Sequence, residues 1–334
     1  MRASDEKAVG VGPRGFPHLP SIVSGDGVRW VDHRRTLTPR YGVVWRDIAA
    51  TYVFLLVGVL VATAAERSGW PPGALVALAA GAALWTGYWL HALFLFGHEA
   101  AHRNLAPTSR TNDRLGDWLV WLLFGSTTRN YRRTHMAHHA HLGDHGDSET
   151  TYHLCMSVVN MMKATVGLHV LEVLLRKAKA DRKPTRESGT AAGVLASARS
   201  AAAHLLIVLG LWSAGAPVVA LSWVIGVASV FPLFATIRTI VEHRRVDAAC
   251  DVDFGKTRHG AVNRMFGTGL VSRYFGSAGF NRHLLHHWDP AISYTRFDEM
   301  ERFFATTPLA AEMDASRTSY GAAVRTLMAE ARRG

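Results

Sequence analysis

Cysteine is scarce in this sequence, and its scarcity is informative. Cys155 and Cys250 are the only two cysteines among 334 residues, and neither has a neighbour at CxxC spacing. A disulfide framework, a cysteine-ligated iron–sulfur cluster and a thiolate zinc site each need more thiols, so the count argues against all three. We expect the two cysteines, which lie far apart in the sequence, to be separate structural thiols.

The N-terminus lacks the apolar core of a signal peptide. Residues 1–46 carry mixed charge and contain the runs GVGPR and PHLP. A cleavable signal peptide has a continuous apolar stretch after a basic start, which this region does not provide. Because proline and glycine interrupt regular structure, we expect an irregular, partly disordered lead-in here.

Charge is missing from several long stretches, although the chain as a whole is basic. Four apolar segments lie at about 48–65, 73–96, 195–214 and 217–237, and Arg199 interrupts the third. A membrane-spanning helix needs about 20 apolar residues, so the segments predict four transmembrane helices in two hairpins. The chain is 49% hydrophobic yet has a formal net charge of +11, which fits a membrane protein whose charges collect on one side.

The distribution of lysine and arginine predicts the orientation of the hairpins. The link at 66–72 has Arg67 as its single basic residue, and the link around Gly215 has none. The N-terminal, middle and C-terminal regions are basic, including a stretch at 176–186. By the positive-inside rule these regions face the cytoplasm, with both termini inside. We expect three parts in the chain: a cytoplasmic lead-in at 1–46, a membrane domain at 47–310 and a cytoplasmic tail at 311–334.

Three histidine clusters dominate the chemistry of the sequence. The pattern HxxxH occurs at 98–102, and HxxHH occurs at 135–139 and again at 283–287. With 18 histidines in the chain, HxxHH is expected by chance roughly 0.05 times. The clustered histidines are His98, His102, His135, His138, His139, His283, His286 and His287. The predicted topology places all three clusters on the cytoplasmic side, where they can meet in one site.

Spacing and ligand type both indicate a metal centre. Residues at i, i+3 and i+4 share one face of a helix, so each cluster presents convergent ring nitrogens. Imidazole without thiolate suits iron, zinc or copper rather than calcium or magnesium. Eight imidazoles are too many for one ion, which points to two ions in one site. Structural histidines are the simpler alternative, but so many buried unpaired imidazoles would be costly.

Further side chains near the clusters are candidates for the same site. His243 follows Glu242 at the cytoplasmic end of the fourth apolar segment, and we interpret it as a ninth ligand. Metal-bound imidazoles usually donate their other N–H to a carboxylate or a carbonyl. The simpler alternative for each nearby acid, taken singly, is a surface or helix-capping role. Candidates for supporting groups are Glu242, Asp144, Asp147, Glu149, Asp289 and the neighbouring His141.

The order of the boxes and the two apolar hairpins resemble the membrane fatty acid desaturase superfamily, the integral-membrane histidine-box di-iron enzymes. The resemblance covers about residues 48–300. The run NRHLLHHWDP at 281–290, followed by Tyr294, is similar to bacterial acyl-lipid desaturases. Animal-type acyl-CoA desaturases usually have a longer first box and an asparagine where this chain has Thr239. Alkane hydroxylases have a longer second box, so both branches fit less well.

The resemblance implies a fold, a cofactor and a reaction. The fold is all-α, with four membrane-spanning helices and a cytoplasmic helical cap that holds two iron ions. The implied iron ligands are His98, His102, His135, His138, His139, His243, His283, His286 and His287. The family reaction uses O2 and two electrons to remove hydrogen from an unactivated methylene. Loss of a second hydrogen gives a double bond, so we expect an O2-dependent desaturase of a long acyl chain.

Other activities use related sites and stay open at this point. A hydroxylase or ketolase acting on a lipid, a carotenoid or a tailored metabolite would insert oxygen at the same centre. A metal transporter is disfavoured because its ligands should line a path through the bilayer. A zinc hydrolase is disfavoured because it needs about three protein ligands.

The expected partners follow from the chemistry. The sequence shows no fused cytochrome domain, no ferredoxin-type cysteines and no dinucleotide-binding glycine pattern. Electrons must therefore come from a separate protein, and the basic cytoplasmic face suits an acidic carrier such as a ferredoxin with its reductase. We expect a lipid or acyl substrate, the membrane as a partner, and no nucleic acid.

Overall fold

The computed structural model describes residues 19–168, 171–172, 191–250 and 260–332. The basic stretch at 176–186 and the first 18 residues of the lead-in lie outside these ranges. The described residues are mostly helical and form no β-strand, with isolated bridges such as that between Val23 and Arg29.

The chain divides into two compact units. The membrane unit comprises Pro39–Arg133 and Ser157–Arg238. The histidine unit comprises Met1–Thr38, Thr134–Met156 and Thr239–Gly334. Two helices run from the first unit into the second, namely α5 (Thr128–His141) and α10 (Phe231–His243).

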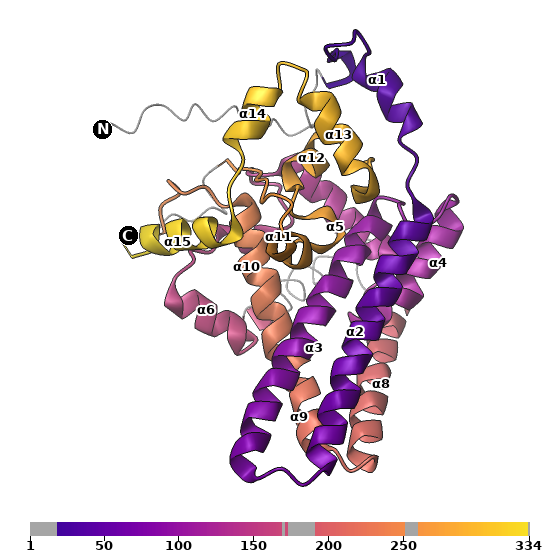
Figure 1. Cartoon of the computed structure of the whole chain (residues 1–334), viewed down its shortest axis with the longest axis vertical. Coiled ribbons are helices and arrows are strands. Elements are labelled where there is room, and N and C mark those ends of the chain that lie inside the picture. The colour runs from indigo at the N-terminus through magenta and orange to yellow at the C-terminus, as the bar shows by residue number, and fades with distance from the viewer. Residues whose placement is uncertain (1–18, 169–170, 173–190, 251–259, 333–334) are drawn as a thin grey trace. The chain divides into compact units, whose positions relative to one another are not determined.

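Long apolar helices build the membrane unit. Helices α2 and α3 form one hairpin, and α8 with α9 forms a second hairpin beside it (Figure 1). Their bounds are α2 Tyr41–Arg67, α3 Pro72–Ala101, α8 Ala191–Ser213 and α9 Pro217–Ile225, and the π-helical turn η5 Gly226–Val230 leads from α9 into α10. Four helices of the described chain are long and apolar enough to cross a membrane, namely Tyr41–Arg67, Pro72–Ala101, Ala192–Ser213 and Pro217–His243. The four apolar helices expected from the sequence are confirmed.

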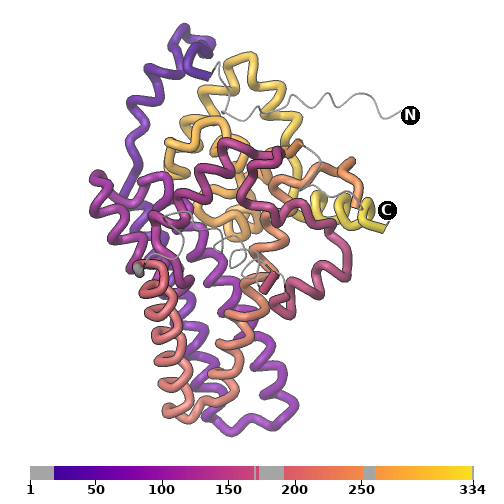
Figure 2. Tube along the Cα trace, turned by 180° about the vertical axis from the view of Figure 1, so that it is seen from behind, coloured from indigo at the N-terminus to yellow at the C-terminus, as the bar shows by residue number. Residues whose placement is uncertain are grey.

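Local sequence determines where these helices turn back. Pro72 and Pro217 occupy the first positions of α3 and α9, where the missing N–H of proline costs nothing. Gly215 ends the turn after α8 with a φ of 75°, a conformation that glycine adopts without strain. The carboxylate of Glu66 accepts hydrogen bonds from the N–H groups of Val218 and Val219, both at 2.9 Å. This contact joins the two links, which lie together in the view from behind (Figure 2).

Glycines allow α3 to pack closely against the π-helical turn. A Cβ atom placed on Gly87 would lie 2.4 Å from the Cβ of Val230. One placed on Gly226 would lie 2.8 Å from the Cβ of Thr86. Without a strong hydrophobic driving force in lipid, such close backbone approach is a main source of helix association. Among the described residues, shorter helical segments of this unit include α4 Ser109–Leu119, η3 Trp121–Leu123 and α6 Val158–Thr165.

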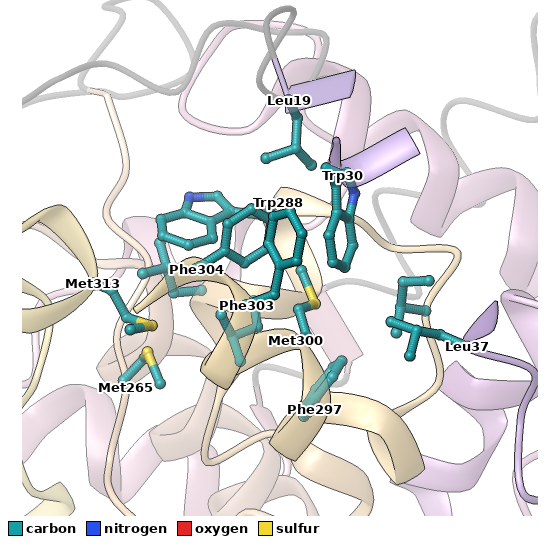
Figure 3. Packing of buried hydrophobic residues seen from close by; sticks show 13 residues of the cluster. Leu19, Trp30, Leu37, Met265, Trp288, Phe297, Met300, Phe303, Phe304 and Met313 are labelled. Carbon is teal, nitrogen blue, oxygen red and sulfur yellow. The ribbon is translucent and has the colours of Figure 1, made fainter. Parts of the chain in front are cut away.

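Short helices around one hydrophobic cluster build the histidine unit. Besides the ends of α5 and α10, its helical segments are η1 Leu19–Ser21, α1 Trp30–His33, η2 Arg34–Thr36, η4 Thr150–His153, α11 Leu270–Phe275, η6 Ser277–Gly279, α12 His283–Trp288, η7 Tyr294–Arg296, α13 Phe297–Phe304, α14 Ala310–Ala315 and α15 Tyr320–Glu330. The cluster includes Trp30, Trp288, Phe303 and Phe304, which lie against one another (Figure 3). The ring of Trp30 is 4.6 Å from that of Phe304, and Trp288 is 5.0 Å from the same ring.

Both chain ends contribute to this unit more than the sequence suggested. Within the expected irregular lead-in, Leu19, Trp30 and Leu37 are buried in the cluster, and Trp30 is fully enclosed. In the expected tail, Tyr320 stacks on Phe266 at 3.9 Å. The described part of the lead-in is therefore folded, because its few large apolar side chains find the cluster around α12 and α13.

The expectation of two separate thiols is wrong. Cys155 and Cys250 form a disulfide across 95 residues of sequence. Cys155 follows the second histidine box, and Cys250 follows the end of α10. Both segments belong to the histidine unit, and their folding brings together sulfurs that no sequence spacing connects.

Candidate metal centre

Helix α5 carries the second histidine box. Its last turns belong to the histidine unit and present His135, His138 and His139 at i, i+3 and i+4. His135 and His138 are buried, so the box projects into the protein and not into solvent. The Nε2 atoms of His135 and His139 are 2.9 Å apart. One helix therefore brings two ring nitrogens to a single point.

Helix α12 carries the third box in a fully buried position. All six of its residues are buried, although three of them are histidines. Leu284, Leu285 and Trp288 of this helix belong to the hydrophobic cluster, which anchors the helix and leaves its imidazoles to face one another. His283 and His287, one turn apart, have Nε2 atoms 3.1 Å apart.

A first group of nitrogens joins the second and third boxes. His139 Nε2 lies 2.9 Å from His135 Nε2 and 2.9 Å from His286 Nε2. These three residues come from two helices separated by more than 140 residues of sequence. Their convergence confirms that the two HxxHH boxes meet within one unit.

A second group adds the isolated histidine at the end of α10. His283 Nε2 lies 2.9 Å from His243 Nε2 and 3.1 Å from His287 Nε2. His138 extends the group, because one nitrogen each of His138, His243 and His287 lie within 4.8 Å of one another. His243, which sequence alone marked as a ninth candidate, thus lies among the box histidines.

Hydrogen bonding does not satisfy either group. A ring nitrogen carries either one proton or one lone pair, so it makes one good hydrogen bond along its axis. His139 Nε2 and His283 Nε2 each face two other Nε2 atoms at hydrogen-bond distance. In an octahedral site with bonds of about 2.1 Å, neighbouring ligand nitrogens lie about 3.0 Å apart. The observed spacing therefore suits one metal ion at each group.

Acceptors hold the outer nitrogens of three of these rings. His135 Nδ1 lies 2.8 Å from a Glu149 oxygen, and His138 Nδ1 lies 2.8 Å from an Asp147 oxygen. His243 Nδ1 lies 3.2 Å from the carbonyl oxygen of Val262. An acceptor at Nδ1 keeps the proton there and leaves the lone pair of Nε2 for a metal ion.

Asp147 is itself held by several donors. Besides His138, its carboxylate accepts from the hydroxyl of Tyr152 and from the N–H groups of Gly143 and Glu149. Tyr152 is fully buried, and burial together with the Asp147 charge raises the pKa of its phenol, so the hydroxyl keeps its proton. The orientation of His138 is therefore fixed by a network and not by one contact.

Other predicted supporting groups have different surroundings. Glu242 is fully buried, with one carboxylate oxygen 3.8 Å from His283 Nε2. Asp289 accepts from the Trp30 indole at 2.9 Å and pairs with Arg34 at 3.2 Å, so it ties α1 to the end of α12. Asp144 accepts from the backbone N–H of His145 in the turn after α5, and the side chain of His141 is exposed there.

The first box lies at the end of α3 in the membrane unit. His98 is buried, His102 caps the helix, and their ring centroids are 4.7 Å apart. Glu99 between them is buried and accepts from the Asn104 side chain at 3.2 Å. The turn after this helix is braced by Asn112, which accepts from the N–H of Leu105 and donates to the carbonyl of Ala100. The box thus has the one-face geometry that its spacing predicted.

Burial sets the charge state around the centre. Burial lowers the pKa of His287 well below its usual 6.5, and the neighbouring imidazoles lower it further. Neutral imidazole is the form that binds a metal ion. Burial also raises the pKa of Asp289, against the opposing effects of Arg34 and Trp30. The neutral, enclosed ring of His287 can therefore offer a lone pair to a divalent cation.

Some supporting residues had no signal in the sequence. The guanidinium of Arg264 donates to the carbonyls of Val241 and Arg244, both at 2.8 Å, and so holds the end of α10 next to His243. Tyr152 and the Val262 carbonyl carry no metal-binding motif. Tyr152 follows Asp147 by five residues, and only the turn of the chain brings its hydroxyl back to that carboxylate.

The fold and the site define a mostly helical membrane protein whose histidine clusters suit a metal ion. A family model described as fatty acid desaturase matches residues 68–317, which is most of the chain. The chain belongs to the fatty acid desaturase family. A comparison with curated proteins found no match. The family makes the chain a desaturase-like membrane oxidoreductase, as the sequence motifs implied.

Proposed function

We propose that this protein is an O2-dependent desaturase that introduces a double bond into a long acyl chain at a centre of two iron ions. The convergence of two groups of imidazole nitrogens, each too crowded for hydrogen bonding alone, carries this proposal. The family match supports the reaction class, and the four apolar helices support a lipid substrate. We also propose, from the run at 281–290, that the protein belongs with bacterial acyl-lipid desaturases.

Nine histidines would hold the two ions. The first ion would bind His135, His139 and His286, together with His98 and His102 from the first box. The second would bind His138, His243, His283 and His287. When bound, the iron pair supplies the activation of O2, with two external electrons, that removes hydrogen from an unactivated methylene. Nine ligands leave positions open on a pair of six-coordinate ions, which O2 chemistry requires.

The chain's own residues prepare this centre. Glu149, Asp147 and the Val262 carbonyl hold protons at the Nδ1 atoms of His135, His138 and His243, so their Nε2 lone pairs face inward. Glu242, buried beside His283, adds negative charge that favours cations. Burial of α12 excludes water from the site, which protects reactive oxygen chemistry from side reactions.

We further propose that both chain termini and the histidine unit face the cytoplasm, as the distribution of basic residues indicates. Electrons would come from an acidic carrier such as a ferredoxin with its reductase, attracted by the basic cytoplasmic face. If so, electron transfer to the protein should slow as ionic strength rises. A rate that does not respond to salt would contradict electrostatic docking.

Mass spectrometry of lipids and small metabolites tests the reaction. Cells producing the wild-type chain are compared with cells producing His138→Ala, and with a matched control, His145→Ala, which alters an exposed histidine outside the proposed ligand set. A product lighter by two hydrogens, present with wild type and the control and lost in His138→Ala, is expected. A product heavier by one oxygen would instead make the protein a hydroxylase. Failure of the iron-loaded, reduced protein to consume O2 with any lipid would refute both.

A further inference from the structure

The disulfide joins one buried and one exposed sulfur. Cys155 is buried, whereas Cys250 is exposed. The sequence contains no other cysteine. A small thiol or disulfide from solution can therefore reach the sulfur of Cys250, and it is blocked from that of Cys155.

Arg244 places a positive charge against the buried sulfur. Its Nη2 lies 3.1 Å from Cys155 Sγ, and the guanidinium is fixed by the carbonyls of His153 at 2.5 Å and Ala248 at 2.8 Å. Arg244 is itself buried. A cation held beside a sulfur stabilises its thiolate, and a stabilised thiolate leaves faster in thiol–disulfide exchange. The two sulfurs are thus chemically unequal.

We propose that Cys155 and Cys250 form a reversible thiol–disulfide switch that external thiols open at Cys250. A thiolate attacks Cys250 Sγ, a mixed disulfide forms there, the Cys155–Cys250 bond breaks, and Cys155 leaves as a thiolate beside Arg244. A second thiolate attacks the mixed disulfide, releases the external disulfide and leaves Cys250 reduced. Two external thiols lose two electrons in total, and the protein disulfide gains them. A low-molecular-weight disulfide or hydrogen peroxide closes the switch again.

The proposed compartment favours a switch over a permanent bond. On the orientation proposed above, the histidine unit faces the cytoplasm, where glutathione keeps most protein thiols reduced. Disulfides found there are usually redox-sensing or catalytic. An exposed sulfur paired with a good leaving group is the kind of disulfide that such a thiol pool controls.

The switch is linked to the supports of the metal ligands. Arg244 follows His243 directly, and its side chain binds carbonyls at His153 and Ala248, one on each segment that the disulfide joins. Tyr152, next to His153, donates to Asp147, which holds His138. Opening the disulfide removes the covalent link between the segments that follow His138 and His243. We therefore expect the reduced protein to release iron faster, a consequence that rests on the proposed metal centre.

Thiol counting tests the switch without reference to metal or activity. The full-length protein in detergent is equilibrated in glutathione buffers of graded reduction potential, quenched with acid, and titrated for thiols after denaturation. The switch predicts a reversible change between zero and two thiols per chain, with glutathione trapped on Cys250 in Cys155→Ser. Two thiols in every buffer, or a bond that millimolar glutathione leaves intact in the folded protein, would overturn the proposal.

Two sets of variants test the effect of Arg244 on disulfide reduction and the effect of the disulfide on iron retention. Arg244→Gln should slow reduction at least severalfold, whereas Arg245→Gln, which removes a surface partner of Asp247, should not. Iron-loaded wild type should lose iron to a chelator at least threefold faster in a reducing than in an oxidising glutathione buffer. The double variant Cys155→Ser/Cys250→Ser should lose iron at the same rate in the two buffers. Equal rates for wild type would refute the link to the centre. A chain that never retains iron would refute the proposed function, while the thiol count would still report on the switch.

Discussion

Replacement of Asp147 by asparagine tests the network that orients His138. The carboxylate accepts the proton of His138 Nδ1 at 2.8 Å and also accepts from the Tyr152 hydroxyl. Asparagine keeps the size of the side chain but offers one acceptor oxygen and an NH2 group. If the oxygen stays with Tyr152, the amide nitrogen faces His138 Nδ1 and favours the tautomer with its proton on Nε2. That tautomer has no lone pair on Nε2, so His138 cannot bind a metal ion through this nitrogen.

The magnitude follows from measured effects of such supporting groups. Loss of a partner to a metal-bound histidine typically weakens metal binding 10- to 100-fold, or about 1.4–2.7 kcal/mol. Because His138 is one of four proposed ligands of its ion, we expect Asp147→Asn to weaken binding of one ion by about this factor. The second ion, held by the other group, should bind nearly as in wild type.

The assay is iron competition with a chelator of known affinity, followed through the loss of iron from purified protein. The matched control is Asp144→Asn, three residues away, whose carboxylate accepts from the backbone N–H of His145. Thermal unfolding of both apo variants shows whether the fold is retained. Wild-type iron affinity in a folded Asp147→Asn protein would show that Asp147 does not orient His138 for metal binding.

Three further predictions concern the fold. Trp30→Ala should lower the free energy of unfolding by about 3–5 kcal/mol, because it removes a fully buried indole; Trp70→Ala, at an exposed position, should change it little in the same denaturation experiment. Glu66→Ala should lower the melting temperature in detergent, since two N–H groups at the start of α9 lose their acceptor at a cost of about 1 kcal/mol; an unchanged melting temperature would contradict this cap. Asp113 keeps a lowered pKa because its bonds to Arg132 and Asn112 outweigh the effect of burial, so it stabilises the fold above the usual aspartate pKa of 3.8 and less as the pH falls below it. Asp113→Asn should therefore cost about 1 kcal/mol at pH 7, after allowance for solvent screening, and progressively less as the pH falls below 3.8 through the lowered pKa. A difference in the free energy of unfolding that does not change with pH in chemical denaturation would contradict a stabilising Asp113–Arg132 pair.

The sequence predicted the elements whose pattern is local. Runs of about 20 apolar residues indicated the four long helices, and the i, i+3, i+4 spacing indicated that His135, His138 and His139 share a helix face. Conversely, the disulfide depends on a contact across 95 residues, which spacing does not encode. Trp30 looked like part of an irregular lead-in because its partners, Phe303 and Phe304, lie far along the chain.

The candidate site likewise combines residues that local sequence identifies with residues whose roles depend on distant contacts. His243 was identifiable because it ends an apolar segment, where a histidine beside a glutamate is unusual. Asp147 was one of several acids after the second box, and only the fold shows that it binds His138, whereas Asp144 accepts from the backbone N–H of the next residue, His145. Asp289 was a reasonable partner for the third box by proximity in sequence. Its contacts are instead with Trp30 and Arg34, because α12 ends where α1 packs.

The iron content of the purified protein is the most direct test of the proposed centre of two iron ions. Protein produced with iron supplied is analysed by elemental analysis and by Mössbauer spectroscopy with 57Fe. We expect close to two irons per chain with the spectrum of a nitrogen-ligated, high-spin pair, and a clear loss of iron in His138→Ala but not in His145→Ala. One ion per chain, or zinc in place of iron under these conditions, would contradict it.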